Sequence, residues 1–166
     1  MVKNCVLCYN PLTSQEHKQK CREILMFSDI TIPVNNLNKL MTCGLGGCYA
    51  SIILFEKNYE KFIFMIHTPF IEKFINTIQN YINEYKILHI TIKCPGKYIK
   101  NDGMFIMVPD NEKINTEIVS LFNENYKYII EPYGLDDNSY NSQIGIKMLD
   151  NKLLVSDNYG RFIKID

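Results

Sequence analysis

The stretch TCGLGGCYASIILFEKNYEKFIFMIH, residues 42–67, decides the fold of this chain. Two runs of strand-forming residues, 49–55 and 61–66, flank a short polar segment, and this pattern predicts an antiparallel hairpin. A glycine-rich turn comes directly before the first run and ends at Cys48. Three of the eight glycines of the chain lie in that turn. Their clustering favours a backbone with positive φ angles beside this cysteine.

The rest of the chain alternates between helical and strand patterns. Apolar residues at helical spacing predict one helix over 71–85, after Pro69, and a second over 110–125. Residues 34–40 and 132–142 are predicted as connections. Further strands are predicted at 30–32, 88–92, 104–108, 128–131, 144–149, 152–156 and 161–165. Because no regular βαβ repeat appears, the pattern predicts an α/β or α+β fold with mixed sheets and helices packed on the outer faces.

Composition argues against several functional classes. The chain has 166 residues, which predicts one domain with a small appendage. The formal net charge is zero, so nucleic acid is an unlikely partner. Apolar stretches end well short of about 18 residues, so no membrane insertion is expected. The first residues lack the apolar core of a signal peptide, so we expect a cytoplasmic protein with reduced cysteines.

Cys48 and His67 form the predicted reactive pair. A cysteine thiol needs a base that takes its proton or lowers its pKa. Because antiparallel strands return the chain to its starting end, the hairpin should place His67 beside Cys48. Thr42 is expected to accept a hydrogen bond from the other ring nitrogen of His67, the orienting role in a triad. Gly46 and Gly47 are expected to offer backbone N–H groups to a developing oxyanion.

Other interpretations stand beside this one. A cysteine at the start of a strand is more often a small core residue, and a histidine at a strand end is usually a surface residue. The chain would then be a non-catalytic interaction module. A cysteine hydrolase that acts on a small-molecule amide is a further alternative. The residues alone do not choose between these functions.

The motif Thr42-Cys43-Gly44-Leu45-Gly46-Gly47-Cys48, followed by a hairpin and His67, resembles the signature of the CheD family of chemoreceptor glutamine deamidases. That family has a Thr-x-Gly-Leu-Gly-Ser-Cys type of motif and a histidine on the next strand. The order of helices and strands over residues 28–166 is similar as well. The resemblance implies two packed mixed sheets flanked by helices, an α/β/β/α arrangement shared with the catalytic domain of the cytotoxic necrotizing factor toxins.

The resemblance also implies a function and roles for residues. Cys48 would be the nucleophile of a protein glutamine deamidase, His67 its general base and acid, and Thr42 the orienting hydroxyl. The partner would be a protein with an exposed glutamine, and catalysis would need no cofactor. Gly47 stands where the family usually has serine, and the loop at 134–138 departs from the family's pattern. These departures point away from a chemoreceptor as the substrate.

A second motif lies at the N-terminus. A C-x2-C pair is followed by a histidine and a cysteine four residues apart on a helix predicted over 14–27. A Cys3His set suits tetrahedral zinc, which would stabilise a segment too short for its own core. The spacing is short for common zinc fingers, so a disulfide or free thiols remain alternatives. The predicted organisation is a zinc-knuckle-like segment over 1–27 and a deamidase domain over 28–166. The four candidate ligands are Cys5, Cys8, His17 and Cys21.

Overall fold

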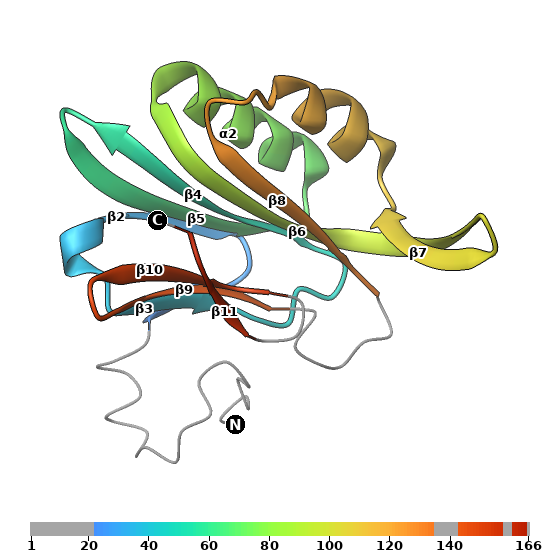
Figure 1. Cartoon of the computed structure of the whole chain (residues 1–166), viewed down its shortest axis with the longest axis horizontal. Helices are drawn as coiled ribbons and strands as arrows, with labels where there is room; N and C mark the ends of the chain where they lie inside the picture. Colours follow the sequence, from blue (N-terminus) through green and yellow to red (C-terminus); the bar gives the residue numbers. More distant parts are fainter. Residues whose placement is uncertain (1–21, 135–142, 158–160, 166) are drawn as a thin grey trace, which may run out of the picture.

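Two β-sheets packed face to face form the body of the protein (Figure 1). The structure is a computed structural model that describes residues 22–134, 143–157 and 161–165. The smaller sheet contains, in spatial order, β1 (Arg22–Glu23), β3 (Lys39–Thr42), β9 (Ile144–Leu149), β10 (Lys152–Ser156) and β11 (Phe162–Lys164). The larger sheet contains, in spatial order, β2 (Ser28–Pro33), β5 (Glu60–Thr68), β4 (Tyr49–Lys57), β6 (Lys86–Asn101) and β7 (Met104–Pro109), with β8 (Lys127–Tyr133) also paired to β6.

Each sheet combines parallel and antiparallel neighbours. β1 pairs with β3 in parallel, and so does β6 with β8. The β4–β5, β4–β6 and β9–β10 pairs are antiparallel. The predicted α+β fold with two packed mixed sheets is therefore confirmed.

The predicted hairpin lies at the centre of the larger sheet. β4 and β5 pair in register until Lys57 stands opposite Glu60. The connection is the two-residue turn Asn58–Tyr59, with φ angles of 52° and 65°. The sequence predicted a longer turn over 56–60. Two more cross-strand pairs form instead, because Glu56 stands opposite Lys61 and Lys57 opposite Glu60, and opposite charges favour such pairs.

β4 is buried on both faces, which explains its nearly continuous apolar sequence. One face packs into the core between the two sheets, and the other packs against the helical segments. Ala50, Ile52 and Leu54 belong to the inter-sheet core, and Tyr49, Ile53 and Phe55 belong to the helix-side core. The strand thus links both halves of the core, and its first residue follows Cys48.

The helical segments cover the outer face of the larger sheet (Figure 1). The predicted helix after Pro69 is α2 (Ile71–Glu84), which buries Phe74, Ile75 and Ile78. The second predicted helix is shorter and irregular, with a π-helical turn η3 (Ile114–Ile118) and a 3-10 turn η4 (Val119–Leu121). Within the described ranges, no helix lies over the outer face of the smaller sheet.

Residues 22–27 pack against the two sheets, which corrects the helix prediction for this segment. β1 pairs with β3, and Ile24 is buried between the sheets. The helix predicted over 14–27 is wrong for 22–27, because strand pairing and the burial of Ile24 override local helix propensity. The predicted division into segments 1–27 and 28–166 stays a prediction, because residues 1–21 lie outside the described ranges. The segment predicted as a connection, 34–40, holds the short 3-10 turn η2 (Val34–Asn36) and the start of β3.

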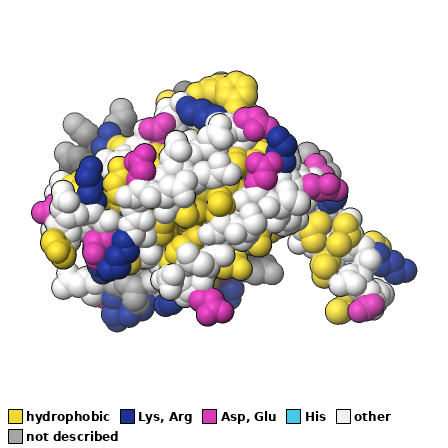
Figure 2. All heavy atoms as spheres, turned by 90° about the horizontal axis from the view of Figure 1, so that it is seen from above, with side chains coloured by type: hydrophobic (Ala, Val, Ile, Leu, Met, Phe, Trp, Pro, Cys, Tyr) yellow, Lys and Arg dark blue, Asp and Glu magenta, His cyan; other side chains and the backbone are white. Residues whose placement is uncertain are grey.

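The long strand β6 leaves the sheet as a two-stranded ribbon. It pairs with β8 as far as Pro95 and with β7 from Gly96 onward. The ribbon projects from the body (Figure 1), and apolar side chains gather on it (Figure 2). A Cβ at Gly96 would lie 2.7 Å from Cβ of Pro132, so the crossing with β8 requires glycine. The exposed apolar residues of the ribbon include Tyr98, Met104 and Phe105.

Candidate active site

A tight turn presents Cys48 at the start of β4. The Cys48 N–H donates a hydrogen bond of 2.6 Å to the Leu45 carbonyl. The two central residues, Gly46 and Gly47, have φ angles of 47° and 99°, the left-handed pair that a type I′ turn needs. Leu45 is fully buried in the inter-sheet core and anchors the turn. The glycines therefore cluster before Cys48 because the backbone path requires positive φ.

Tyr133, at the end of β8, holds this turn from the other side. Its hydroxyl accepts a hydrogen bond of 2.9 Å from the Gly47 N–H and donates one of 2.8 Å to the Cys48 carbonyl. Burial raises the pKa of the Tyr133 phenol, so the hydroxyl keeps the proton that it donates. The sequence assigned Tyr133 to a polar loop, and no sequence signal links it to a turn 85 residues away.

Replacing Tyr133 with phenylalanine should remove both hydrogen bonds to the turn while the aromatic ring still fills its place in the core. The change leaves the Gly47 N–H and the Cys48 carbonyl without this partner, so we expect a loss of about 2 kcal/mol in the free energy of unfolding. We also expect Cys48 to react about tenfold more slowly with iodoacetamide, because the turn no longer fixes its position. Urea unfolding and mass-mapped alkylation measure the two effects.

Tyr126→Phe is the matched control, because its hydroxyl also donates to a backbone carbonyl, that of Leu121, at 3.1 Å. This variant should leave the alkylation rate of Cys48 unchanged. Equal effects of Tyr133→Phe and Tyr126→Phe on that rate would contradict a positioning role for Tyr133.

Thr42 sets the protonation pattern of His67. Thr42 Oγ1 lies 2.7 Å from His67 Nδ1 and donates a hydrogen bond of 2.7 Å to the Ile24 carbonyl. Because a hydroxyl has one proton, and this one goes to Ile24, Nδ1 of His67 is the donor to Thr42. Nε2 of His67 therefore carries the lone pair. That atom is buried and has no hydrogen-bond partner in the described part of the chain.

Cys48 and His67 lie on the same face of the larger sheet. The register of β4 and β5 places His67 opposite Ala50, two residues after Cys48. Side chains two positions apart share a face, and Cys48 belongs to the same inter-sheet core as Ala50. Cys48 is therefore a diagonal cross-strand neighbour of His67. The fold thus brings together Thr42, Cys48 and His67 at one end of the hairpin.

Burial sets the ionisation of this pair. Cys48 is only 5% exposed, and burial raises the pKa of its thiol. Burial also lowers the pKa of the His67 imidazole. Both shifts favour the uncharged forms. The resting pair at neutral pH is therefore a thiol and a neutral imidazole, and the thiolate forms only when the imidazole takes the proton.

The backbone donors of the turn differ in availability. The Cys48 N–H bonds to Leu45, and the Gly47 N–H bonds to Tyr133. Gly46 is exposed, and its N–H bonds to none of the described residues. Of the two predicted oxyanion donors, Gly46 is therefore available and Gly47 is occupied by Tyr133.

A buried ion pair lies near the site on the same face of the sheet. Lys93, on β6, stands opposite Ala50, and its side chain is fully buried. Its Nζ lies 3.1 Å from Oε2 of Glu131 on β8. Burial lowers the pKa of Lys93, and Glu131 acts in the opposite direction. The pair ties β6 to β8, the strand that ends at Tyr133.

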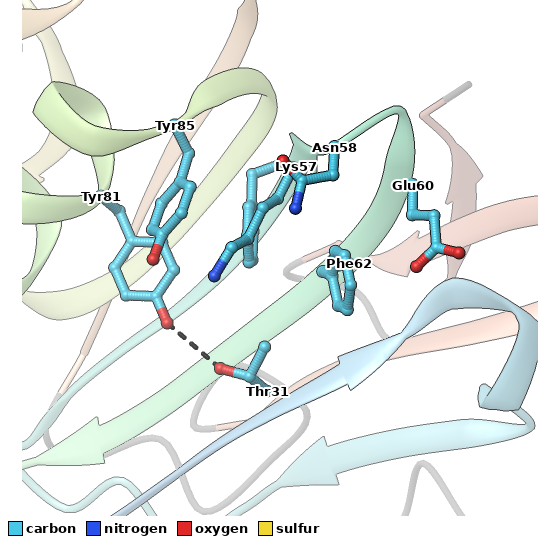
Figure 3. Close-up of a pocket in the computed structure, with 8 residues that line it drawn as sticks. Thr31, Lys57, Asn58, Glu60, Phe62, Tyr81 and Tyr85 are labelled. Atoms are coloured by element: carbon cyan, nitrogen blue, oxygen red, sulfur yellow. Dashed lines mark hydrogen bonds between the residues drawn. The ribbon is translucent and has the colours of Figure 1, made fainter.

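An open pocket of about 350 Å³ lies at the opposite end of the hairpin (Figure 3). Aromatic rings form much of its wall, and the Tyr81 hydroxyl bonds to Thr31 at 3.1 Å. Phe55 is seven residues from Cys48 along the chain, a separation of roughly 20 Å in a strand. The pocket contains no cysteine or histidine and is therefore separate from the candidate active site. Its lining residues are Thr31, Phe55, Lys57, Asn58, Glu60, Phe62, Tyr81 and Tyr85.

The predicted zinc ligands Cys5, Cys8, His17 and Cys21 lie outside the described residues. Zinc binding by this segment therefore stays a prediction from the sequence. Within the described ranges, no group of three or more histidine, cysteine, aspartate or glutamate side chains is arranged to hold a metal ion. The described helices also include none that is long and apolar enough to span a membrane.

No protein-family model matches this chain, and no curated protein matches its sequence. Among solved structures, the chain is similar to the crystal structure of the C-terminal domain of CNFy from Yersinia pseudotuberculosis, with 8% sequence identity and a TM-score of 0.31. The likeness covers 83% of this chain and 56% of that chain. A likeness at this level assigns neither family nor activity, so the candidate site rests on the chain's own residues.

Proposed function

We propose that this protein is a cysteine-dependent glutamine deamidase that acts on a partner protein. The observation that carries the proposal is the hydrogen-bond chain from His67 Nδ1 through Thr42 to the Ile24 carbonyl. This chain leaves Nε2 of His67 as a free base on the face that carries Cys48. The buried His89 also has one bonded and one unpartnered ring nitrogen, so the feature that distinguishes His67 is its place diagonally across the strand pair from Cys48.

The chemistry would proceed in two steps. The Cys48 thiol gives its proton to Nε2 of His67 as Sγ attacks the carboxamide carbon of a glutamine side chain. The C–N bond breaks, and the imidazolium returns the proton to the nitrogen, which leaves as ammonia. Water then attacks the thioester, again with His67 as the base. The carbon–sulfur bond breaks, which yields glutamate and restores the thiol.

The Gly46 N–H is the backbone donor that we assign to the oxyanion of each tetrahedral intermediate. Tyr133 would contribute indirectly, because it fixes the turn that carries both Gly46 and Cys48. Glutamine in a protein, rather than another amide, is chosen because the motif at 42–48 and His67 resemble those of the CheD deamidases.

Ammonia release from a glutamine-containing protein tests this proposal. We would incubate the chain with unfolded casein, follow ammonia, and map glutamine-to-glutamate conversion by mass spectrometry. The wild type should release ammonia, and Cys48→Ser should release none because a serine hydroxyl is a far weaker nucleophile beside this histidine. Conversion at equal rates in both proteins would contradict the role of Cys48.

The pH dependence of Cys48 alkylation should show its acid limb below pH 6.5, because burial lowers the pKa of His67 from that ordinary value. Above the pKa of His67, the imidazole is neutral and can accept the thiol proton. As the pH falls through this pKa, Nε2 becomes protonated and the rate should fall about tenfold per pH unit. Iodoacetamide reactions quenched at successive times between pH 4.5 and pH 8 measure the rate of Cys48 alkylation as a function of pH. An acid limb above pH 6.5 would show that burial does not dominate at His67.

A further inference from the structure

Met26 covers the candidate nucleophile. Sγ of Cys48 lies within hydrogen-bond distance of Sδ of Met26, at 3.5 Å. Met26 is 46% exposed, whereas Cys48 is 5% exposed. One flexible side chain at the surface therefore shields the thiol from solvent, and methionine is well suited to such movement because it has three rotatable side-chain bonds.

The same contact takes up the only proton of the Cys48 thiol. The thiol proton points to Met26, while Nε2 of His67 has no hydrogen-bond partner in the described part of the chain. A catalytic Cys–His pair needs a hydrogen bond between these two groups. The structure thus shows a resting arrangement in which all parts of the site are present but the last contact is not made.

The turn that carries Met26 is anchored on the site at both ends. The Ile24 carbonyl accepts the hydrogen bond from Thr42, and the Phe27 N–H donates a bond of 2.8 Å to the His67 carbonyl. The turn closes with a bond of 3.2 Å from the Ser28 N–H to the Leu25 carbonyl. Phe27 has a φ angle of 69°, a left-handed conformation that is unfavourable for a bulky side chain. Strain of this kind is typical of functional segments.

Large apolar side chains surround Met26 on the surface. Leu25 is 66% exposed, Phe27 is 55% exposed and Phe70 is 58% exposed. The rings of Phe27 and Phe70 lie 5.8 Å apart, so the turn and the start of α2 form one patch. An exposed apolar patch beside a reactive residue is typical of an interaction surface.

We propose that Leu25, Phe27 and Phe70 dock an apolar segment of the protein substrate, and that docking displaces Met26 so that the Cys48 thiol can meet His67. The inference rests on the proposed function and selects its substrate class. A free amino-acid amide has no apolar surface that would cover this patch. A protein segment with apolar side chains next to its glutamine covers the patch and excludes water from the site.

Alkylation of Cys48 in the Met26→Ala variant tests whether the Met26 side chain shields the Cys48 thiol. We expect iodoacetamide to react about fivefold faster with Cys48 in this variant, because one ordered side chain no longer has to move. Met104→Ala, at an exposed methionine of the ribbon, is the matched control and should leave the rate unchanged. Equal alkylation rates of Cys48 in the wild type and Met26→Ala would contradict the claim that Met26 shields the thiol.

Electrophilic peptides test the docking surface. The probes are two peptides that carry a chloroacetamide in place of the glutamine carboxamide, flanked by leucines in one and by serines in the other. On the wild type, we expect the leucine peptide to label Cys48 about tenfold faster than the serine peptide, because apolar contacts stabilise its complex. The double variant Leu25→Ser and Phe70→Ser should lose this preference. Leu149→Ser, an exposed leucine at the far end of β9, should retain it.

The outcomes separate this inference from the proposed function. Absence of a preference for the leucine peptide on the wild type would overturn the docking surface, even if Cys48 requires His67 for reaction. Conversely, Cys48 alkylation that is faster in Met26→Ala but unaffected by removal of His67 would support shielding by Met26 and contradict the proposed chemistry. Circular dichroism of each variant reports whether the fold is kept.

Discussion

Replacing His67 with alanine should slow the alkylation of Cys48 at pH 7 by about 10²-fold or more, the range of a general base. Burial raises the pKa of the thiol above its ordinary value of 9.0, so the thiolate is scarce without a base. Nε2 of His67, free and unprotonated, is the group positioned to take the proton. The rate is best compared both in the wild type and in Met26→Ala, where the thiol is free to turn toward the imidazole.

The pH dependence gives this experiment a second readout. In the wild type, the rate should be nearly constant above the lowered pKa of His67. In His67→Ala, the rate should instead rise with pH as the thiol itself ionises, above pH 9.0. His89→Gln is the control, because His89 is also a buried histidine but faces Thr91. A profile that is the same in wild type and His67→Ala would remove the basis for the Cys–His pair.

His89 should make the protein lose about 3 kcal/mol of stability as the pH falls from 6.5 to 4. It is 1% exposed, and Nε2 lies 2.7 Å from Oγ1 of Thr91, while Nδ1 is buried without a partner within the described ranges. Burial, with a smaller effect from Lys127, lowers the pKa of His89 from 6.5 to about 4. Above pH 6.5 the imidazole is neutral in both states, so it adds no pH dependence. Between pH 6.5 and 4 the unfolded chain binds a proton that the folded chain does not, so folding becomes less favourable.

Urea unfolding of wild type and His89→Gln between pH 7 and pH 4 measures this effect. Glutamine does not titrate, so the variant should lose less stability on acidification, by about 3 kcal/mol over the interval. Carboxylates titrate in both proteins, and their contribution cancels in the comparison. Parallel stability curves for the two proteins would show that His89 takes up a proton in the folded state near its ordinary pKa.

Several features were predicted correctly because they depend on neighbours in sequence. The hairpin at the centre of the larger sheet follows from two apolar runs and a short connection, and the register of that hairpin is local. The predicted hydrogen bond between Thr42 and His67 is also present, although it joins β3 of the smaller sheet to β5 of the larger sheet and so depends on the packing of the two sheets. α2 was also predictable, because its apolar residues recur at helical spacing and a proline precedes it.

Other features depend on partners that are distant in sequence. β1 has two residues, and only its pairing with β3 makes it a strand, so the local pattern at 22–27 predicted a helix. The contact of Met26 with Cys48 follows from the pairing of β1 with β3, so the sequence did not predict it either.

The sequence by itself determined the central hairpin, the glycine turn and helix α2, because neighbouring residues impose these features, whereas the packing of two sheets was implied by the resemblance to the CheD family. Only the tertiary structure decided which backbone N–H remains available in the turn, since Tyr133 arrives from a strand 85 residues away. Tertiary structure also decided that Nδ1 of His67 is the protonated nitrogen, because the carbonyl that takes the Thr42 proton belongs to Ile24. Hydrogen bonds of this kind form between groups that packing brings together, and no periodicity of the chain encodes them.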